Sequence, residues 1–146
     1  LLMADDFMGN IFFEISLDII DVNKIIFNYF NNDCGSVVFF VGKVRNYNDN
    51  NKVVGINYDM YDDFMLITLF NICSYYNILK NCRIYVSHFK GYLKIGEISI
   101  IIVVESCNRK ESFVICNMIL EDIKNKLPIW KYEYYINEYA CWISER

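Results

Sequence analysis

The feature that most constrains the fold is the run EISIIIVVES at 97–106, in which β-branched side chains follow one another almost without interruption. Such a run is typical of a strand buried on both faces, since a half-exposed strand would alternate apolar and polar residues. We therefore predict that 97–106 is the central strand of a sheet.

The rest of the chain consists of short periodic segments separated by polar or glycine-containing breaks. Helices are predicted at 21–30, 62–79 and 109–126, the first capped by Asp21 and the second by Asp62 or Asp63. Further strands are predicted at 11–17, 36–45, 53–60, 82–89, 131–135 and 139–143. The polar loop 46–52 suggests that the two strands beside it form an antiparallel pair.

This order of elements, without a repeat or a linker, predicts a single α+β domain with a mostly antiparallel sheet and about three helices. We expect the domain to span 11–146, after a flexible tail at 1–10 that lacks the pattern of a signal peptide. The longest uncharged run, 64–79, is shorter than the ~20 residues of a membrane-spanning helix. It is predicted to be a buried helix.

Composition excludes several classes of protein. A chain of 146 residues with 55% hydrophobic residues can bury a sizeable core and has apolar surface to spare for a partner. The 14 Lys and Arg stand against 18 Asp and Glu, which argues against a general binder of nucleic acid or of anionic membranes. Any anion site must therefore be local.

The cysteines and the histidine give no sign of a metal site. The six cysteines include no CxxC pair, and the single histidine, His88, cannot complete a zinc-like set with them. We expect no metal, no cofactor, and reduced thiols in an intracellular, cytoplasmic protein. His88 itself is expected to be a structural residue at a strand end rather than a general base.

Lysines gather around the only proline, Pro128, in the segment EDIKNKLPIWKYE at 121–133. In an acidic chain, this helix-to-strand corner is a candidate anion site. Lys124 follows Leu120 by four residues, which places it about 40° round the helix from the predicted apolar stripe. It is either a partly desolvated proton donor or a lysine that extends into solvent, and spacing alone favours the second. The apolar stripe is predicted to contain Phe113, Cys116, Leu120, Ile123 and Leu127.

The other end of the same helix offers a second candidate. Asn108, with Glu111 three residues later, predicts an N-cap and its capping-box partner. Arg109 then lies beside exposed backbone N–H groups, where it either helps to bind an anion or is a solvated surface residue. Arg45, at the end of its strand, has the same two interpretations. The GK pair at 42–43 is not a phosphate loop, because the required glycine and Ser/Thr are missing.

Four segments, in their order and spacing, resemble the catalytic large subunit of molybdopterin synthase. They are GSVVFFVGKVR at 35–45, HFKGYLKIGE at 88–97, SCNRKESF at 106–113 and KNKLPIWKYE at 124–133. The resemblance covers nearly the whole chain from about residue 11 onward and implies the α/β hammerhead fold of that family.

The resemblance implies a sulfurtransferase of molybdenum cofactor biosynthesis. In that family a small ubiquitin-like subunit inserts a C-terminal Gly-Gly thiocarboxylate into a pocket of the large subunit. Two sulfurs then pass to cyclic pyranopterin monophosphate, which becomes molybdopterin. The implied partners are the small subunit, a second copy in a homodimer, and the pterin phosphate, with no nucleic acid and no membrane.

The resemblance also assigns roles to particular positions. Lys124 matches the catalytic lysine beside the incoming thiocarboxylate, and Lys131 matches the second essential lysine. The substrate-binding positions fall on Arg45, Asn108, Arg109 and Arg146, and the positions that line the channel for the partner's tail fall on Phe40 and Leu120.

One departure bears on the mechanism. The family commonly has histidine before the helix arginine, and this chain has Asn108, which cannot carry a proton near neutral pH. Any proton transfer made by that histidine would pass to Lys124 or Lys131. There is also one extra residue between Lys131 and Trp142, which affects the match of Arg146. A module that binds a ubiquitin-like tail without transferring sulfur, and a small anion-binding regulatory domain, are the alternative functions.

Overall fold

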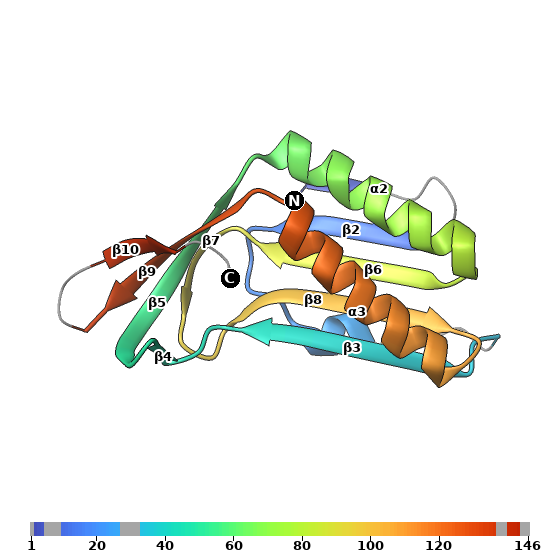
Figure 1. The fold of residues 1–146 in the computed structure, drawn as a ribbon, viewed down its shortest axis with the longest axis horizontal. Helices are drawn as coiled ribbons and strands as arrows, with labels where there is room; N and C mark the ends of the chain where they lie inside the picture. Colours follow the sequence, from blue (N-terminus) through green and yellow to red (C-terminus); the bar gives the residue numbers. More distant parts are fainter. Residues whose placement is uncertain (1, 5–9, 27–32, 137–139, 144–146) are drawn as a thin grey trace.

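The computed structural model of the chain describes residues 2–4, 10–26, 33–136 and 140–143, which form two sheets and three helices (Figure 1). The larger sheet has the order β1 (Leu2–Ala4), β2 (Ile11–Ser16), β6 (Arg83–Phe89), β8 (Ile98–Ser106) and β3 (Ser36–Lys43). The smaller sheet has the order β10 (Ala140–Ile143), β9 (Ile129–Tyr135), β5 (Asn51–Met60) and β4 (Tyr47–Asn48), and β7 (Gly91–Lys94) also pairs with β5.

Antiparallel pairing dominates both sheets. Among the strands that the structure describes, only β2 and β6 run parallel. The predicted α+β class with a mostly antiparallel sheet is therefore confirmed. Part of the N-terminal segment expected to be a tail, Leu2–Ala4, pairs with β2.

Strand β8 is an interior strand, as its β-branched run predicts. It pairs with β6 on one side and with β3 on the other, and all its residues after Ile98 are buried. Ile100 and Ile102 face one hydrophobic core, whereas Ile101 and Val103 face a second core on the opposite side of the sheet. Because both faces are buried, no alternation of polar residues is possible along this strand.

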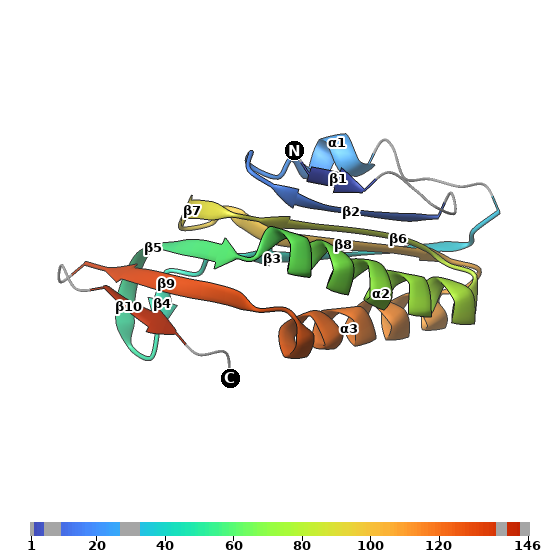
Figure 2. The ribbon, with the colours of Figure 1, turned by 90° about the horizontal axis from the view of Figure 1, so that it is seen from above.

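The two long helices cover one face of the larger sheet. Helices α2 (Asp62–Lys80) and α3 (Arg109–Lys126) lie side by side there, and the short helix α1 (Val22–Ile26) lies on the opposite face (Figure 2). The Tyr76 hydroxyl of α2 donates a hydrogen bond of 2.8 Å to Asp122 of α3. Burial, together with this bond, raises the pKa of Tyr76 to about 12.

The corner at Pro128 brings the end of α3 to the small sheet. Leu127 is the C-cap of α3, its N–H donates to the Ile123 carbonyl at 3.0 Å, and β9 begins two residues later. Proline cannot continue a helix, so the chain turns directly into β9. The lysines on the two sides of the corner are thereby placed on two different elements.

The predicted pairing of the strands beside the loop 46–52 is wrong. Strand β3 pairs with β8 in the larger sheet, whereas β5 pairs with β7 and β9 in the smaller one. The loop forms a tight hairpin of its own between β4 and β5, with positive φ at Asp49 (46°) and Asn50 (66°). This hairpin turns the chain from one sheet to the other.

The helix starts were predicted with mixed success. Asp21 accepts a backbone hydrogen bond of 3.0 Å at the start of α1, as predicted, and the expected extension of α1 toward residue 30 lies outside the described residues. The prediction that Asp62 or Asp63 caps α2 is wrong. The N-cap is Tyr61, which makes no side-chain capping bond, and Asp62 instead accepts a hydrogen bond from Lys90.

The interpretation of 64–79 as a buried helix holds for one side only. Met65, Leu69, Ile72 and Tyr76 are buried against the sheet, but several large apolar residues on the other side of α2 are exposed. No helix in the described part of the chain is long and apolar enough to cross a membrane.

Candidate functional site

The predicted bounds of α3 are confirmed, but its buried stripe is rotated from the predicted one. Phe113 is 64% exposed, because the face that packs against the sheet is centred on Ile115 and Ile119. Lys124 directly follows the buried Ile123, so it lies about 100° round the helix from it. Its side chain is 50% exposed, which agrees with the interpretation that spacing favoured, a lysine that extends into solvent. The buried residues of α3 are Ser112, Ile115, Cys116, Ile119 and Ile123.

A hollow with a cavity volume of about 590 Å³ lies between the end of α3, strand β3 and the small sheet. Four cations line this cationic hollow, against two carboxylates, so it carries a net charge of +2 in a chain whose net charge is −4. The charged residues are Lys43, Arg45, Lys124, Lys131, Asp49 and Glu133. This hollow therefore matches the prediction of a local anion site in an acidic chain.

Five of the predicted site residues come together here. Phe40 of β3 and Leu120 of α3 provide apolar wall, and Arg45, Lys124 and Lys131 provide charge. The structure thus joins three elements, far apart in sequence, that the resemblance assigned to one pocket.

The two lysines differ in their surroundings. Lys124 lies 3.6 Å from Glu121 in an i,i+3 ion pair on the surface of α3. Lys131 is half-buried on β9, where it pairs in register with Tyr58 of β5. Surface ion pairs are weak, so Lys124 can exchange Glu121 for an incoming anion at little cost.

A hydrogen-bond network that runs from the exposed Arg45 to the buried Glu133 orients Arg45. The Arg45 guanidinium donates to Asn48 Oδ1 at 3.0 Å, and Asn48 Nδ2 donates to Glu133 Oε2 at 3.1 Å. The Tyr135 hydroxyl donates to the same oxygen at 2.5 Å. Glu133 is only 4% exposed, so its carboxylate needs hydrogen-bond donors such as these within the fold. Burial and the hydrogen bond to Glu133 raise the pKa of Tyr135.

His88 lines the same hollow although it was expected only to be structural. It is buried, its Nδ1 lies 2.9 Å from the Phe89 carbonyl oxygen, and its ring meets Tyr58 edge-on at 5.5 Å. These contacts hold the ring in place. Packing and hydrogen bonding thus support the expected structural role.

Sequence reasoning missed several lining residues, among them Lys43, Asn48, Tyr58 and Glu133. Glu133 could have been found, because it lies two residues after Lys131 on a strand and must share its face. Asn48 could not, because its position depends on the β4–β5 hairpin. All six cysteines are free.

Asn108 and Arg109 do not line the cationic hollow of their own chain. Asn108 is the N-cap of α3, as predicted, and its side chain accepts a hydrogen bond of 3.1 Å from the Glu111 N–H. Arg109 is exposed in the first turn. It precedes Lys124 by fifteen residues of one helix, a separation of about 22 Å along the axis. Arg146 lies outside the described residues.

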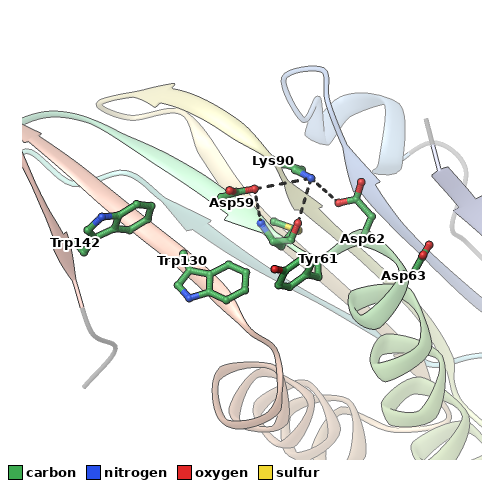
Figure 3. Close-up of a pocket in the computed structure, with 8 residues that line it drawn as sticks. Asp59, Tyr61, Asp62, Asp63, Lys90, Trp130 and Trp142 are labelled. Carbon is green, nitrogen blue, oxygen red and sulfur yellow. Dashed lines mark hydrogen bonds and ion pairs between the residues drawn. The ribbon is translucent and has the colours of Figure 1, made fainter.

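A second hollow, of about 770 Å³, is lined by three carboxylates and three aromatic rings (Figure 3). Lys90, the only cation among its described lining residues, bonds to Asp62 at 2.7 Å and to the Met60 carbonyl at 3.1 Å, and it lies 3.9 Å from Asp59. This anionic hollow has a net charge of −2 and would repel an anionic substrate. Its lining residues are Asp59, Met60, Tyr61, Asp62, Asp63, Lys90, Trp130 and Trp142.

Comparison with known proteins identifies the family of the chain. The family model described as MoaE protein matches residues 15–126. The molybdopterin synthase catalytic subunit of Synechococcus elongatus is 32% identical over 111 residues, which cover 75% of this chain and 67% of that protein. Molybdopterin synthase catalytic subunit 1 of Mycobacterium tuberculosis is 32% identical over 115 residues, which cover 77% of this chain and 76% of that protein.

Solved structures extend the similarity to the whole fold. The crystal structure of molybdopterin synthase from Staphylococcus aureus superposes with a TM-score of 0.84 at 28% identity, covering 91% of this chain and 97% of that one. A protein–protein complex of subunits 1 and 2 of molybdopterin-converting factor from Helicobacter pylori gives a TM-score of 0.77 at 25% identity, covering 92% of this chain and 91% of that one. The chain therefore belongs to the MoaE protein family.

Proposed function

We propose that this chain catalyses the sulfur transfer that converts cyclic pyranopterin monophosphate to molybdopterin, using the C-terminal thiocarboxylate of a small ubiquitin-like subunit. The observation that carries this proposal is the cationic hollow, in which Lys124, Lys131 and Arg45 meet beside the apolar residues Phe40 and Leu120. Relatives that are named molybdopterin synthase catalytic subunits support the same activity.

The charge of the hollow suits the two reactants. A thiocarboxylate and a phosphate-bearing pterin are both anions, so their approach is opposed by mutual repulsion. Four cations in a partly enclosed site offset this repulsion and stabilise the charge that develops during transfer. The arginine suits a bidentate grip on phosphate, whereas the lysines suit point-charge stabilisation and proton transfer.

The proposed roles follow from position. Lys124 lies one turn after Leu120 on α3, so it stands where a tail passing along that wall would present its thiocarboxylate. Lys131 approaches from β9 on the other side of the Pro128 corner. Arg45, held by Asn48, then receives the phosphate. Each transfer leaves the tail as a carboxylate, with water supplying the oxygen.

Asn108 and Arg109 enter this scheme only if a second copy supplies them, because the length of α3 separates them from the hollow of their own chain. The homodimer expected for the family would allow such an arrangement. Asn108 would then offer an amide hydrogen bond to substrate and leave proton transfer to the lysines. Arg146 stays a candidate for the same pocket.

The proposed setting is a cytoplasmic assembly with the small subunit. The H. pylori structure is a complex of two subunits of molybdopterin-converting factor, which supports a small-subunit partner. Six free cysteines suit a reducing compartment. No cysteine is needed for the chemistry, because sulfur arrives on the partner.

Replacing Lys124 by alanine tests the proposal most directly. With thiocarboxylated small subunit and pterin precursor, we expect Lys124→Ala to lower molybdopterin formation on the order of 10²-fold or more, as for loss of a general acid–base group. Lys126→Ala is the matched control. Lys126 lies on the same helix but outside the hollow, in an ion pair of 2.7 Å with Asp122, and its loss should leave turnover near the wild-type rate.

Two outcomes would contradict the proposal. Wild-type turnover by Lys124→Ala would remove its catalytic role. Tight binding of the small subunit by the wild-type chain without any conversion of the pterin would indicate the tail-binding module instead.

A further inference from the structure

The outer face of α2 is an exposed apolar surface in the part of the chain that the structure describes. Phe64, Ile67, Tyr75 and Ile78 on this face are 54%, 62%, 57% and 73% exposed. Together with the exposed Asn71 they form the outer stripe, at the three- and four-residue spacing of one helix face. No charged residue occurs from Phe64 to Leu79. A contiguous apolar surface of this kind marks an interaction site.

The composition of the stripe limits what can cover it. A charged peptide would find no counter-ion along four turns of helix. A membrane surface is also disfavoured, since interfacial helices need cations on their flanks and this chain is acidic overall. No residue of the outer stripe lines the cationic hollow, so the stripe does not belong to the site for the small subunit's tail. The partner must present an apolar helix or sheet face of its own.

The order of the stripe is symmetric about its centre. Phe64 and Ile78 stand seven residues before and after Asn71, and Ile67 and Tyr75 stand four residues before and after it. In an antiparallel pair of α2 helices, Phe64 of one copy would therefore face Ile78 of the other, and Ile67 would face Tyr75. A two-fold contact of this kind is self-complementary.

The polar residue in the stripe falls on the two-fold axis. Asn71 would meet Asn71 of the second copy, and each amide can donate one hydrogen bond and accept one. A single asparagine in an apolar helical seam fixes the register of the pair. Asn71 would be unfavourable in an ordinary apolar contact, but here its amide would be hydrogen-bonded to the same residue of the second copy.

The exposed area is sufficient for a modest interface. If each whole side chain is counted at about 150–200 Å², the exposed parts of the stripe and of the neighbouring Leu79, which is 56% exposed, come to roughly 500 Å² per copy. Two copies would bury about 1,000 Å² in total, which is the size of a weak or transient interface.

We propose that two copies of this chain associate through antiparallel pairing of their α2 outer stripes. This contact does not depend on the proposed sulfur transfer. If the chain also assembles through other surfaces, this contact would join two such assemblies and double their mass.

Sedimentation velocity of the large subunit over a range of micromolar concentrations tests the pairing. The wild-type chain should double its mass with concentration, and Ile67→Glu/Ile78→Glu should weaken that step at least tenfold. Ile19→Glu is the matched control, because Ile19 is 63% exposed but lies before α1. Circular dichroism verifies that each variant is folded. Equal association by the wild-type and double-variant chains would overturn the proposal.

Cysteine cross-linking tests the register independently. With Cys34, Cys107 and Cys141 replaced by serine, Asn71→Cys should form a disulfide with itself across the axis under mild oxidation. Phe64→Cys should not, because its two copies would lie about 21 Å apart along the helices. Cross-linking by Phe64→Cys alone would overturn the antiparallel arrangement. Loss of small-subunit affinity in Ile67→Glu/Ile78→Glu, with one constant mass for the wild-type chain, would assign the stripe to the small subunit instead.

Discussion

The cationic and anionic hollows lie on opposite faces of the small sheet and share three of its strands, β5, β9 and β10. Tyr58 and Lys131 form a cross-strand pair that lines the cationic hollow, and the next pair along, Asp59 and Trp130, lines the anionic one. Successive side chains on a strand point to opposite faces, so the sheet separates a hollow with a net charge of +2 from one with a net charge of −2.

The difference between the hollows shows how an acidic chain builds an anion site. A shift of one residue in the register of β9 would carry Lys131 to the anionic side. Charge balance also differs: Lys90 is bonded to its neighbours in the anionic hollow, whereas the cations of the other hollow outnumber its carboxylates. Strand alternation and local pairing, more than net charge, decide where an anion binds.

The largest expected effect separates the two hollows by activity. Lys131→Ala should lower molybdopterin formation on the order of 10²-fold or more, since it removes a cation from the proposed transfer site. Lys90→Ala removes the cation of the anionic hollow and should change turnover by less than about threefold. Single-turnover assays with thiocarboxylated small subunit measure both variants.

The opposite activities of these two variants would contradict the assignment of catalysis to the cationic hollow. If Lys90→Ala abolished turnover while its circular dichroism stayed normal, the anionic hollow would have to take part in catalysis. If Lys131→Ala stayed active, the cationic hollow would lose its catalytic assignment.

A smaller effect is expected from the residue that orients Arg45. Asn48→Ala removes the acceptor at 3.0 Å from the guanidinium, so we expect KM for the pterin phosphate to rise about tenfold with little change in kcat. Asn57→Ala is the matched control, because Asn57 lies on β5 and does not line the cationic hollow. A fall in kcat at constant KM would show that Asn48 acts in the transfer step and not in holding substrate.

Parts of the fold were predictable because their signals are local. The run 97–106 is apolar on both faces, and Asn108 and Pro128 mark the two ends of α3 by capping and by breaking the helix. The pairing of β3 was not predictable, because it depends on the direction in which the loop 46–52 leaves the sheet. The short strands β1, β4 and β7 are too brief to show a period.

The candidate site, like the fold, could be predicted from the sequence only in part. Spacing alone could not distinguish Lys124 from an ordinary surface lysine, and the structure leaves it half exposed, so its assignment came from the resemblance. Glu133 could have been predicted from the alternation of side chains along a strand. The distance of Arg109 from the hollow also follows from helix length, once both ends of α3 are known.

Stability should also differ between the two faces of β9. Tyr135→Phe removes one of the two donors to the buried Glu133 carboxylate, so we expect the free energy of unfolding to fall by about 1–3 kcal/mol. Tyr134→Phe keeps its edge-on contacts with Tyr92 and Tyr132, and the change should stay within about 0.5 kcal/mol. Urea denaturation at neutral pH compares the two variants, and equal losses would contradict a special role for the buried network.

The smallest expected effect is the part of the pH dependence of stability that Tyr135 contributes. The pKa of Tyr135 is raised in the fold, whereas an unfolded tyrosine ionises at about pH 10. Below that pH both states keep the proton; above it only the unfolded state loses the proton, so the stability of the native fold falls as pH rises. Tyr135→Phe lacks this term, so its deficit relative to wild type should shrink between about pH 9 and about pH 11. Because Tyr76 titrates in both proteins, urea denaturation of the pair isolates Tyr135, and a deficit that stays constant with pH would show that the Tyr135 proton is not held by the fold.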